Sequence, residues 1–99
     1  MKFAVLFEDN PDSGDIRKQH ILEHLKFLEL HKERINAAGP LLDKDHTAAG
    51  GLWLVDSEDY NDVMQLVEQD PFWSTGLRQS VRILQWRQVF ANGQTLAGI

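Results

Sequence analysis

The feature that most constrains the fold is an alternation of short apolar runs with two segments of helical periodicity. The run 3–7 is apolar on both faces, which is typical of a buried strand. Residues 10–14 combine turn formers with helix N-cap residues, and they predict a helix that starts at 12–15 and runs to about residue 37. Gly39-Pro40 is expected to stop this helix, because proline cannot continue it.

The next part of the chain predicts a hairpin and a second helix. Short strands are expected over 41–42 and 52–55, and Gly50-Gly51 opens the second of them. Apolar residues then recur at helical spacing after a Ser-Glu-Asp start signal. Asp70-Pro71 ends this helix, because the residue before a proline avoids helical geometry.

An alternating run over 81–90 predicts a last strand, which completes the order βαββαβ. In a chain of this size, that order favours an α+β domain with a four-stranded antiparallel sheet and both helices on one face. The 99 residues are enough for one core, which we expect over about 1–90 with a C-terminal tail over 91–99. The content of 42% hydrophobic and 25% charged residues is that of a globular protein.

Both faces of the predicted sheet are apolar, although two helices can cover only one of them. Along the first strand, Ala4 and Leu6 face away from their apolar neighbours, and the run 52–55 is also apolar on both sides. We therefore expect a second copy of the chain to cover the open face. A homodimer through the sheet faces is the simplest closed assembly.

Charge and composition argue against several classes of function. A net charge of −5 without a basic stripe argues against nucleic-acid binding. The absence of cysteine excludes disulfides, thiolate nucleophiles and cysteine metal sites. The N-terminus turns acidic at Glu8, too soon for a signal peptide, and there is no apolar run of membrane-spanning length. These features predict a cytoplasmic protein that does not bind membranes.

Three histidines lie within or beside the apolar arc of the first predicted helix: His20, His24 and His31. One such histidine is usually a half-buried core residue, but three together indicate a cavity with polar walls. His20 and His24 have the four-residue spacing of metal ligands on a helix. Because no third ligand is evident, we predict no metal site.

Asp70 is the carboxylate that chain direction brings toward these histidines. In a βαββαβ sheet the second helix ends at the edge where the first begins, so Asp70 should approach Arg17, His20 and His24. A carboxylate beside an imidazole orients the ring and stabilises its protonated form, as a general acid or base requires. The alternative is that Asp70-Pro71 is simply a helix-ending turn.

Phe72 and Trp73 follow at once in the sequence. Large aromatic residues beside a polar pair are typical of a pocket for a small, ring-containing molecule. They could equally be core or dimer contacts.

Several short motifs resemble, in order and spacing, those of the YciI-like family of small proteins. They are 24–28 (His-Leu-Lys-Phe-Leu), Gly39-Pro40, Gly50-Gly51 at the start of a strand, and 70–72 (Asp-Pro-Phe) with Gly76 following. The resemblance covers about residues 1–90. It implies a ferredoxin-like α+β domain that dimerises through its sheets into an α+β barrel.

The resemblance also implies a catalytic histidine and aspartate, which fall on His24 and Asp70 in this sequence. A relative removes chloride from a hydroquinone, which makes cofactor-independent lyase or isomerase chemistry on small, anionic ring compounds conceivable. The residues expected to line the cleft are Arg17, His20, Phe72 and Trp73, with Arg17 as the nearest anion-binding group.

Two alternatives stay open at this point. His20 lies one turn before His24 and could be the base in its place. The same cleft could also belong to a non-catalytic dimeric module that only binds a small molecule.

Overall fold

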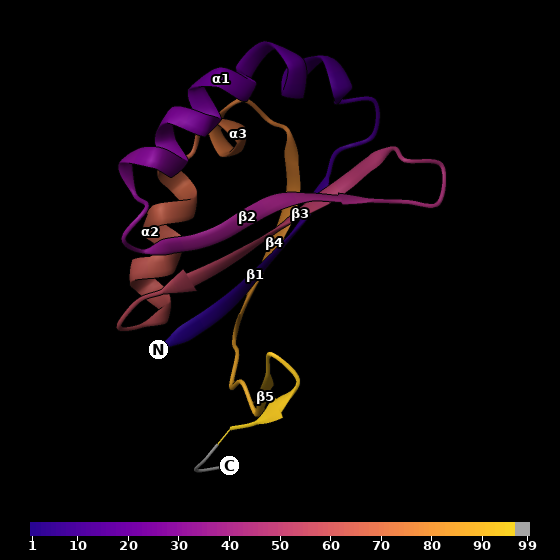
Figure 1. The fold of residues 1–99 in the computed structure, drawn as a ribbon. Helices are drawn as coiled ribbons and strands as arrows, with labels where there is room; N and C mark the ends of the chain where they lie inside the picture. The colour runs from indigo at the N-terminus through magenta and orange to yellow at the C-terminus, as the bar shows by residue number, and fades with distance from the viewer. Residues whose placement is uncertain (97–99) are drawn as a thin grey trace.

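The computed structural model describes residues 1–96, and its elements follow the predicted order with two short additions (Figure 1). The strands of the main sheet are β1 (Lys2–Asp9), β2 (Ile35–Leu42), β3 (Ala48–Asp56) and β4 (Arg78–Gln85). The helices are α1 (Gly14–Leu30), α2 (Tyr60–Gln69) and the one-turn α3 (Pro71–Ser74). A small hairpin follows, formed by β5 (Phe90–Ala91) and β6 (Gln94–Thr95). Within residues 1–96, no helix is long and apolar enough to cross a membrane.

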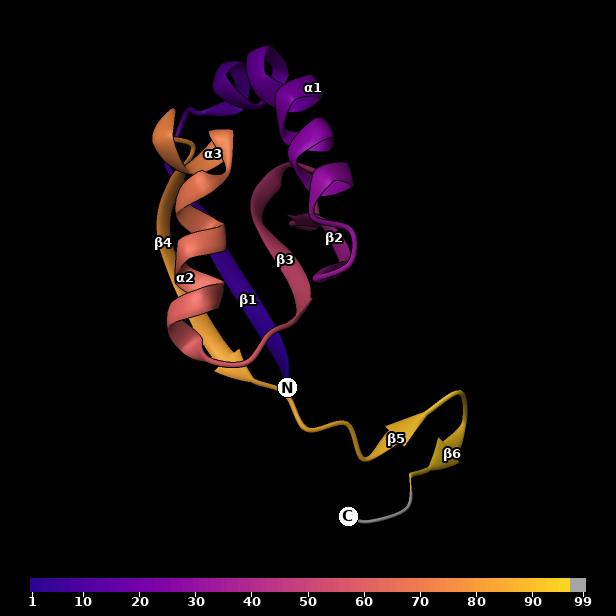
Figure 2. The same cartoon turned by 90° about the vertical axis from the view of Figure 1, so that its left-hand side faces the viewer.

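The four long strands form one sheet in the order β2-β3-β1-β4, and every neighbouring pair is antiparallel. Helices α1 and α2 lie on the same face of this sheet, as Figures 1 and 2 show together. This arrangement confirms the predicted ferredoxin-like α+β fold. Because β1 and β4 are neighbours, the loop that leads into α1 and the turn that leads into β4 meet at one end of the sheet.

Alternate residues of the two central strands fill the layer between the sheet and the helices. Phe3, Val5 and Phe7 of β1 are buried there beside Trp53 and Val55 of β3. Helix α2 completes the core with Val63, Leu66 and Val67. The period-two burial leaves the intervening residues of β1 and β3 on the open face of the sheet.

The first helix ends earlier than the sequence predicts. It stops at Leu30 rather than near residue 37, and Ile35 begins β2. Hydrogen bonds from the amides of residues 34 and 35 to the carbonyl of His31 reverse the chain. Gly39-Pro40 therefore lies inside β2, an edge strand, where proline is tolerated because one side needs no partner. Pairing with β3 outweighs the helical preference of the alanines in this segment.

The last strand is also displaced from its predicted range of 81–90. It covers Arg78–Gln85, and the amide of Trp86 makes the final bond, to the carbonyl of Lys2. Its partner β1 begins at Lys2, and the last register pair of the two strands is Phe3 with Gln85. The chain then leaves the sheet, and Asn92-Gly93, both with positive φ, turn the β5–β6 hairpin, which stands apart from the main body (Figure 2). The end of the predicted tail, residues 97–99, lies outside the described residues.

Candidate active site

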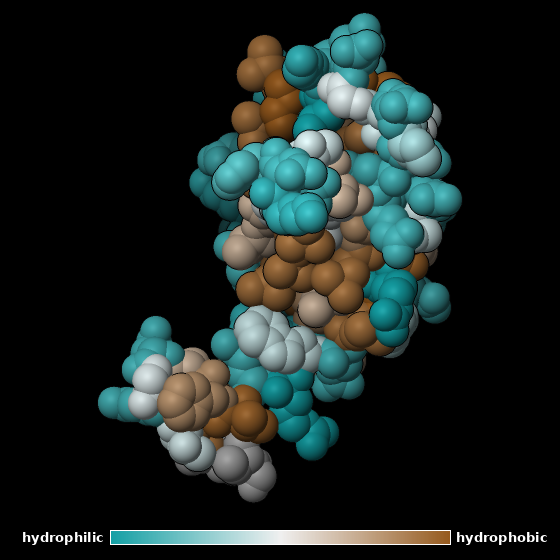
Figure 3. Space-filling view, turned by 90° about the vertical axis from the view of Figure 1, so that its right-hand side faces the viewer, coloured by the Kyte–Doolittle hydropathy of each residue, from teal (hydrophilic) through white to brown (hydrophobic). Residues whose placement is uncertain are grey.

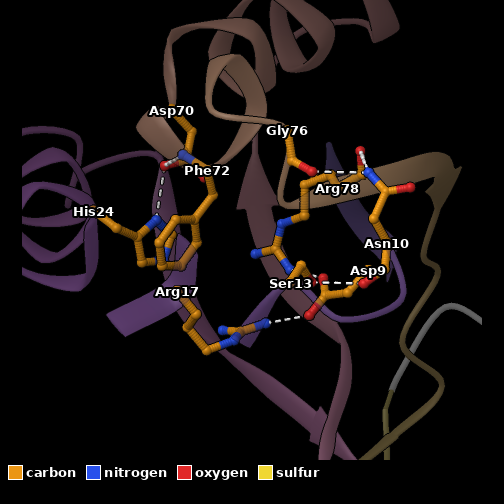
Figure 4. A network of polar contacts seen from close by, with 9 residues as sticks. All are labelled: Asp9, Asn10, Ser13, Arg17, His24, Asp70, Phe72, Gly76 and Arg78. Carbon is orange, nitrogen blue, oxygen red and sulfur yellow. Dashed lines mark hydrogen bonds and ion pairs between the residues drawn. The ribbon is translucent and has the colours of Figure 1, made fainter. Parts of the chain in front are cut away.

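A buried hydrogen bond between His24 and Asp70 joins the middle of α1 to the turn between α2 and α3. The His24 Nδ1 and the Asp70 Oδ1 are 2.7 Å apart, and both side chains are buried (Figure 4). Asp70 is the N-cap of α3, and its Oδ1 also accepts a bond from the Phe72 amide at 3.1 Å. Asp-Pro at a helix start favours this geometry, because the aspartate caps the free amides and the proline fits the first turn.

Two aromatic rings hold the imidazole of His24 in place. The Phe72 ring is stacked on it, with centroids 4.0 Å apart and an interplanar angle of 13°. The indole of Trp53 lies on β3 with its centroid 6.5 Å from that of His24. Since an ionised carboxylate only accepts hydrogen bonds, Nδ1 carries the proton that is donated to Asp70. Nε2 is then the ring nitrogen with a lone pair, and it has no hydrogen-bond partner among residues 1–96.

Two arginines share the carboxylate of Asp9 next to this pair. The Nη2 of Arg17 lies 2.5 Å from Asp9 Oδ2, and the Nη1 of Arg78 lies 2.8 Å from Asp9 Oδ1. The Arg78 guanidinium lies over the Phe7 ring at 4.3 Å and near the Phe72 ring at 5.3 Å. Burial lowers the pKa of Arg78 from its ordinary value, and the hydrogen bond and charge of Asp9 oppose this shift.

The Gly50-Gly51 pair is explained by close contacts on both sides of β3. A Cβ on Gly50 would overlap the carbonyl oxygen of Phe7 in β1. A Cβ on Gly51 would lie 3.0 Å from Nη1 and 3.1 Å from Nη2 of Arg78. The first glycine therefore allows the strands to approach, and the second makes room for the guanidinium.

The histidine and the two arginines of this network line a small cleft between α1 and the edge of the sheet, with a volume of about 110 Å³. Its walls include Arg17 and His24 from α1, Gly39-Pro40 from β2, Trp53 from β3 and Arg78 from β4. Arg17 also borders a second hollow of about 530 Å³, between the β1–α1 loop and the β2–β3 hairpin. The cleft is much smaller than the roughly 300–1,000 Å³ of pockets for drug-sized ligands. It has room for a small molecule only.

The structure brings together four of the six residues predicted for the site: Arg17, His24, Asp70 and Phe72. His20 does not line the cleft, and its buried Nδ1 has no hydrogen-bond partner within residues 1–96, although it lies 3.6 Å from Glu23 Oε1. Trp73 is half-buried against the core and is also absent from the cleft wall. Phe72 is fully buried and does not line the cleft either, so of the four residues expected to line it only Arg17 does.

Asp9 and Arg78 were not predicted from the sequence, although they are register partners on β1 and β4. The signal that could have found them is the topology. It places the end of the first strand beside the start of the last, at the edge where Asp70 was expected.

The third histidine of the predicted helix does not line the cleft. His31 lies beyond the end of α1, where its ring contacts Phe27 with centroids 4.7 Å apart. In the described part of the chain, no three His, Cys, Asp or Glu side chains are grouped so that they could hold a metal ion.

Comparison with known proteins relates the chain to solved structures. The dehydrochlorinase TftG from Burkholderia phenoliruptrix AC1100, which acts on 5-chloro-2-hydroxyhydroquinone, is 29% identical with a TM-score of 0.79. The match covers 88% of this chain and 94% of that one, whose structure contains 2,5-dihydroxybenzoquinone.

A second solved structure and a family model also match the chain. The At3g17210 protein from Arabidopsis thaliana is 11% identical over 92% of this chain and 97% of that one, with a TM-score of 0.47. Among curated proteins, none matches. Residues 1–87 match the YCII-related domain, as the sequence motifs predicted. The chain belongs to the family of YCII-related domain proteins.

Proposed function

We propose that this chain is a small enzyme in which His24 and Asp70 act as a general acid/base pair on a small, ring-containing anion. The observation that carries the proposal is the buried bond of 2.7 Å between His24 and Asp70 beside a cleft. A buried ionisable pair at a cleft is a typical feature of catalytic sites.

The pair is suited to proton transfer. When Nε2 of His24 takes a proton from a hydroxyl or carbon acid of the substrate, the imidazole becomes positively charged. Asp70 then stabilises that charge through Nδ1. The electron pair left on the substrate can expel a leaving group as an anion, which is lyase chemistry. It can also be reprotonated at another atom, which is isomerase chemistry, and neither course requires a cofactor.

The likeness to the dehydrochlorinase supports a ring compound as the substrate class, since that protein acts on a chlorinated hydroxyhydroquinone. The cleft of about 110 Å³ suits a single ring, with the Trp53 indole and the Pro40 ring among its walls. Two arginines beside it favour negatively charged oxygens.

We further propose that two copies associate through their open sheet faces, as in an α+β barrel. Figure 3 shows the side of the molecule that is on the right in Figure 1, away from α1 and α2, and a hydrophobic area lies across its middle. It includes Leu52 and Leu54, which border an apolar groove, and Leu84 on β4. Light scattering after size exclusion should give twice the mass of one chain. The cytoplasm remains the proposed location, because a chain without cysteine needs no oxidising compartment to fold.

Turnover of substituted hydroquinones by variants tests the catalytic role. His24→Ala and Asp70→Asn should abolish release of halide from a chlorinated hydroxyhydroquinone, while the circular dichroism spectrum stays unchanged. His46→Asn is the matched control, because His46 is exposed on the β2–β3 loop and asparagine tolerates its positive φ of 63°. Variants that keep full turnover would refute the acid/base pair.

The alternative of a binding module makes a different prediction. If the unmodified protein turns over none of these compounds, yet both substitutions abolish binding of 2,5-dihydroxybenzoquinone, the cleft only holds a ligand. Calorimetry with that quinone separates the two functions.

A further inference from the structure

The Arg78 side chain is more deeply buried than a guanidinium normally is. Only 3% of its side-chain surface is exposed, compared with 19% for Arg17. It lies over the ring of Phe7 and is within 5.3 Å of the Phe72 ring centroid. Charged side chains are almost never buried to this degree without full pairing.

The pairing of Arg78 is incomplete. Of its three side-chain nitrogens, only Nη1 has a partner among residues 1–96, which is Asp9. Nε is buried and makes no hydrogen bond, whereas Nη2 is unbonded but still in contact with solvent. A buried donor group that the fold leaves unsatisfied usually has a functional reason.

Arg78 is also without a hydrogen bond to the second nearby carboxylate. Arg17 and Arg78 divide the two oxygens of Asp9 between them. The charge of Asp70 acts on Arg78, but among residues 1–96 its Oδ1 is hydrogen-bonded to His24 and to the Phe72 amide and not to the guanidinium. A negative oxygen in the cleft would give the unbonded Nη2 of Arg78 a charged hydrogen-bond partner.

Arg78 is held in the wall of the same cleft as His24. Both side chains border it, and both contact the Phe72 ring (Figure 4). Gly51 leaves room for the guanidinium, because a Cβ there would lie 3.0 Å from Nη1 and 3.1 Å from Nη2. The bond to Asp9 and the Phe7 ring hold it in this place. The arginine is therefore preorganised at a set position relative to the imidazole.

We propose that Arg78 is the specificity-determining residue of the cleft, and that it binds a deprotonated ring hydroxyl of the substrate while His24 faces the reacting part. This inference rests on the proposed function only in taking the cleft as the substrate site. Arg17, which is more exposed and bonded to Asp9 at 2.5 Å, is the secondary anion contact. Arg78 on β4 would then select for an ionised oxygen, and His24 on α1 would transfer the proton.

Calorimetry with two quinones tests this assignment without requiring turnover. The probes are 2,5-dihydroxybenzoquinone, an acidic compound that ionises, and 2,5-dimethoxybenzoquinone, which has no ionisable hydroxyl. The unmodified protein should bind the dihydroxy compound at least about tenfold more tightly. Arg78→Gln should lower that affinity by about 10- to 100-fold and leave binding of the dimethoxy compound unchanged. The control is Arg87→Gln, which removes the same charge from an exposed position after β4.

Gly51→Ala gives a second variant in case Arg78→Gln fails to fold. It removes no charge but displaces the guanidinium, so it too should weaken binding of the dihydroxy compound selectively. Equal affinity of the unmodified protein for the two quinones, or a folded Gly51→Ala or Arg78→Gln protein with unchanged preference, would overturn the proposal. If instead the proposed acid/base pair is wrong, the result is different. His24→Ala would then keep turnover, whether or not Arg78→Gln changes the binding of the quinones.

Discussion

Replacement of Asp70 should separate its two structural roles. Asp70→Ala removes both the partner of His24 and the cap of α3. A buried bond to a charged group contributes about 1.5–3 kcal/mol, and a helix N-cap contributes about 1 kcal/mol. We therefore expect Asp70→Ala to lower the free energy of unfolding by about 3 kcal/mol. Asp70→Asn keeps an oxygen for the Phe72 amide and an uncharged bond to His24, so it should lose only about 1 kcal/mol.

Urea unfolding at fixed protein concentration measures both values, since an assembly would make stability depend on concentration. For a domain of this size, 3 kcal/mol corresponds to a fall of about 10–25 °C in Tm. Equal losses for Asp70→Ala and Asp70→Asn would refute the reasoning, because the oxygen that distinguishes them would then contribute nothing.

A double-mutant cycle isolates the contact itself. Asp70→Ala and His24→Ala should show a coupling energy of at least about 1 kcal/mol. The matched control is Asp70→Ala with His31→Ala. His31 lies beyond the other end of α1, so these two changes should be additive within about 0.5 kcal/mol.

Three further predictions concern the glycine contact, the second histidine and the open face. Gly50→Ala should destabilise the protein by about 3 kcal/mol in urea unfolding, because the new Cβ would overlap the Phe7 carbonyl. Gly39→Ala is the control, and it should change stability by less than about 1 kcal/mol because no atom lies within 4 Å of its Cβ. His20→Ala should keep turnover while His24→Ala lowers it by at least about 100-fold, and the reverse result would move the base one turn earlier. Leu54→Asp should halve the mass measured by light scattering, and an unmodified protein that is already monomeric contradicts the dimer.

Chain direction was enough to predict that Asp70 approaches the part of α1 that carries His20 and His24. The order βαββαβ fixes which ends of the elements meet, and Asp-Pro marks the end of α2 in the sequence itself. The choice between His20 and His24 depends on the rotation of α1 about its axis. That rotation is set by packing against Phe72 and Trp53, which the sequence of the helix does not contain.

Arg78 could not be predicted as a buried group, because an arginine at a strand start is normally solvated. Its burial depends on Gly51 of a different strand and on the rings of Phe7 and Phe72. The end of α1 was misplaced for a similar reason. The segment 35–40 becomes a strand only because β3 offers it a partner, and local preference does not include that pairing.

The ion pair between Asp9 and Arg78 joins residues separated by 69 positions in the chain. It forms only when β4 docks beside β1, after everything between them has been synthesised and folded. A nascent chain that ends before residue 78 has both His24 and Asp70, yet it lacks the guanidinium that completes the cleft. The cleft is therefore a late product of folding, and the anion recognition that we propose for Arg78 would require a complete sheet.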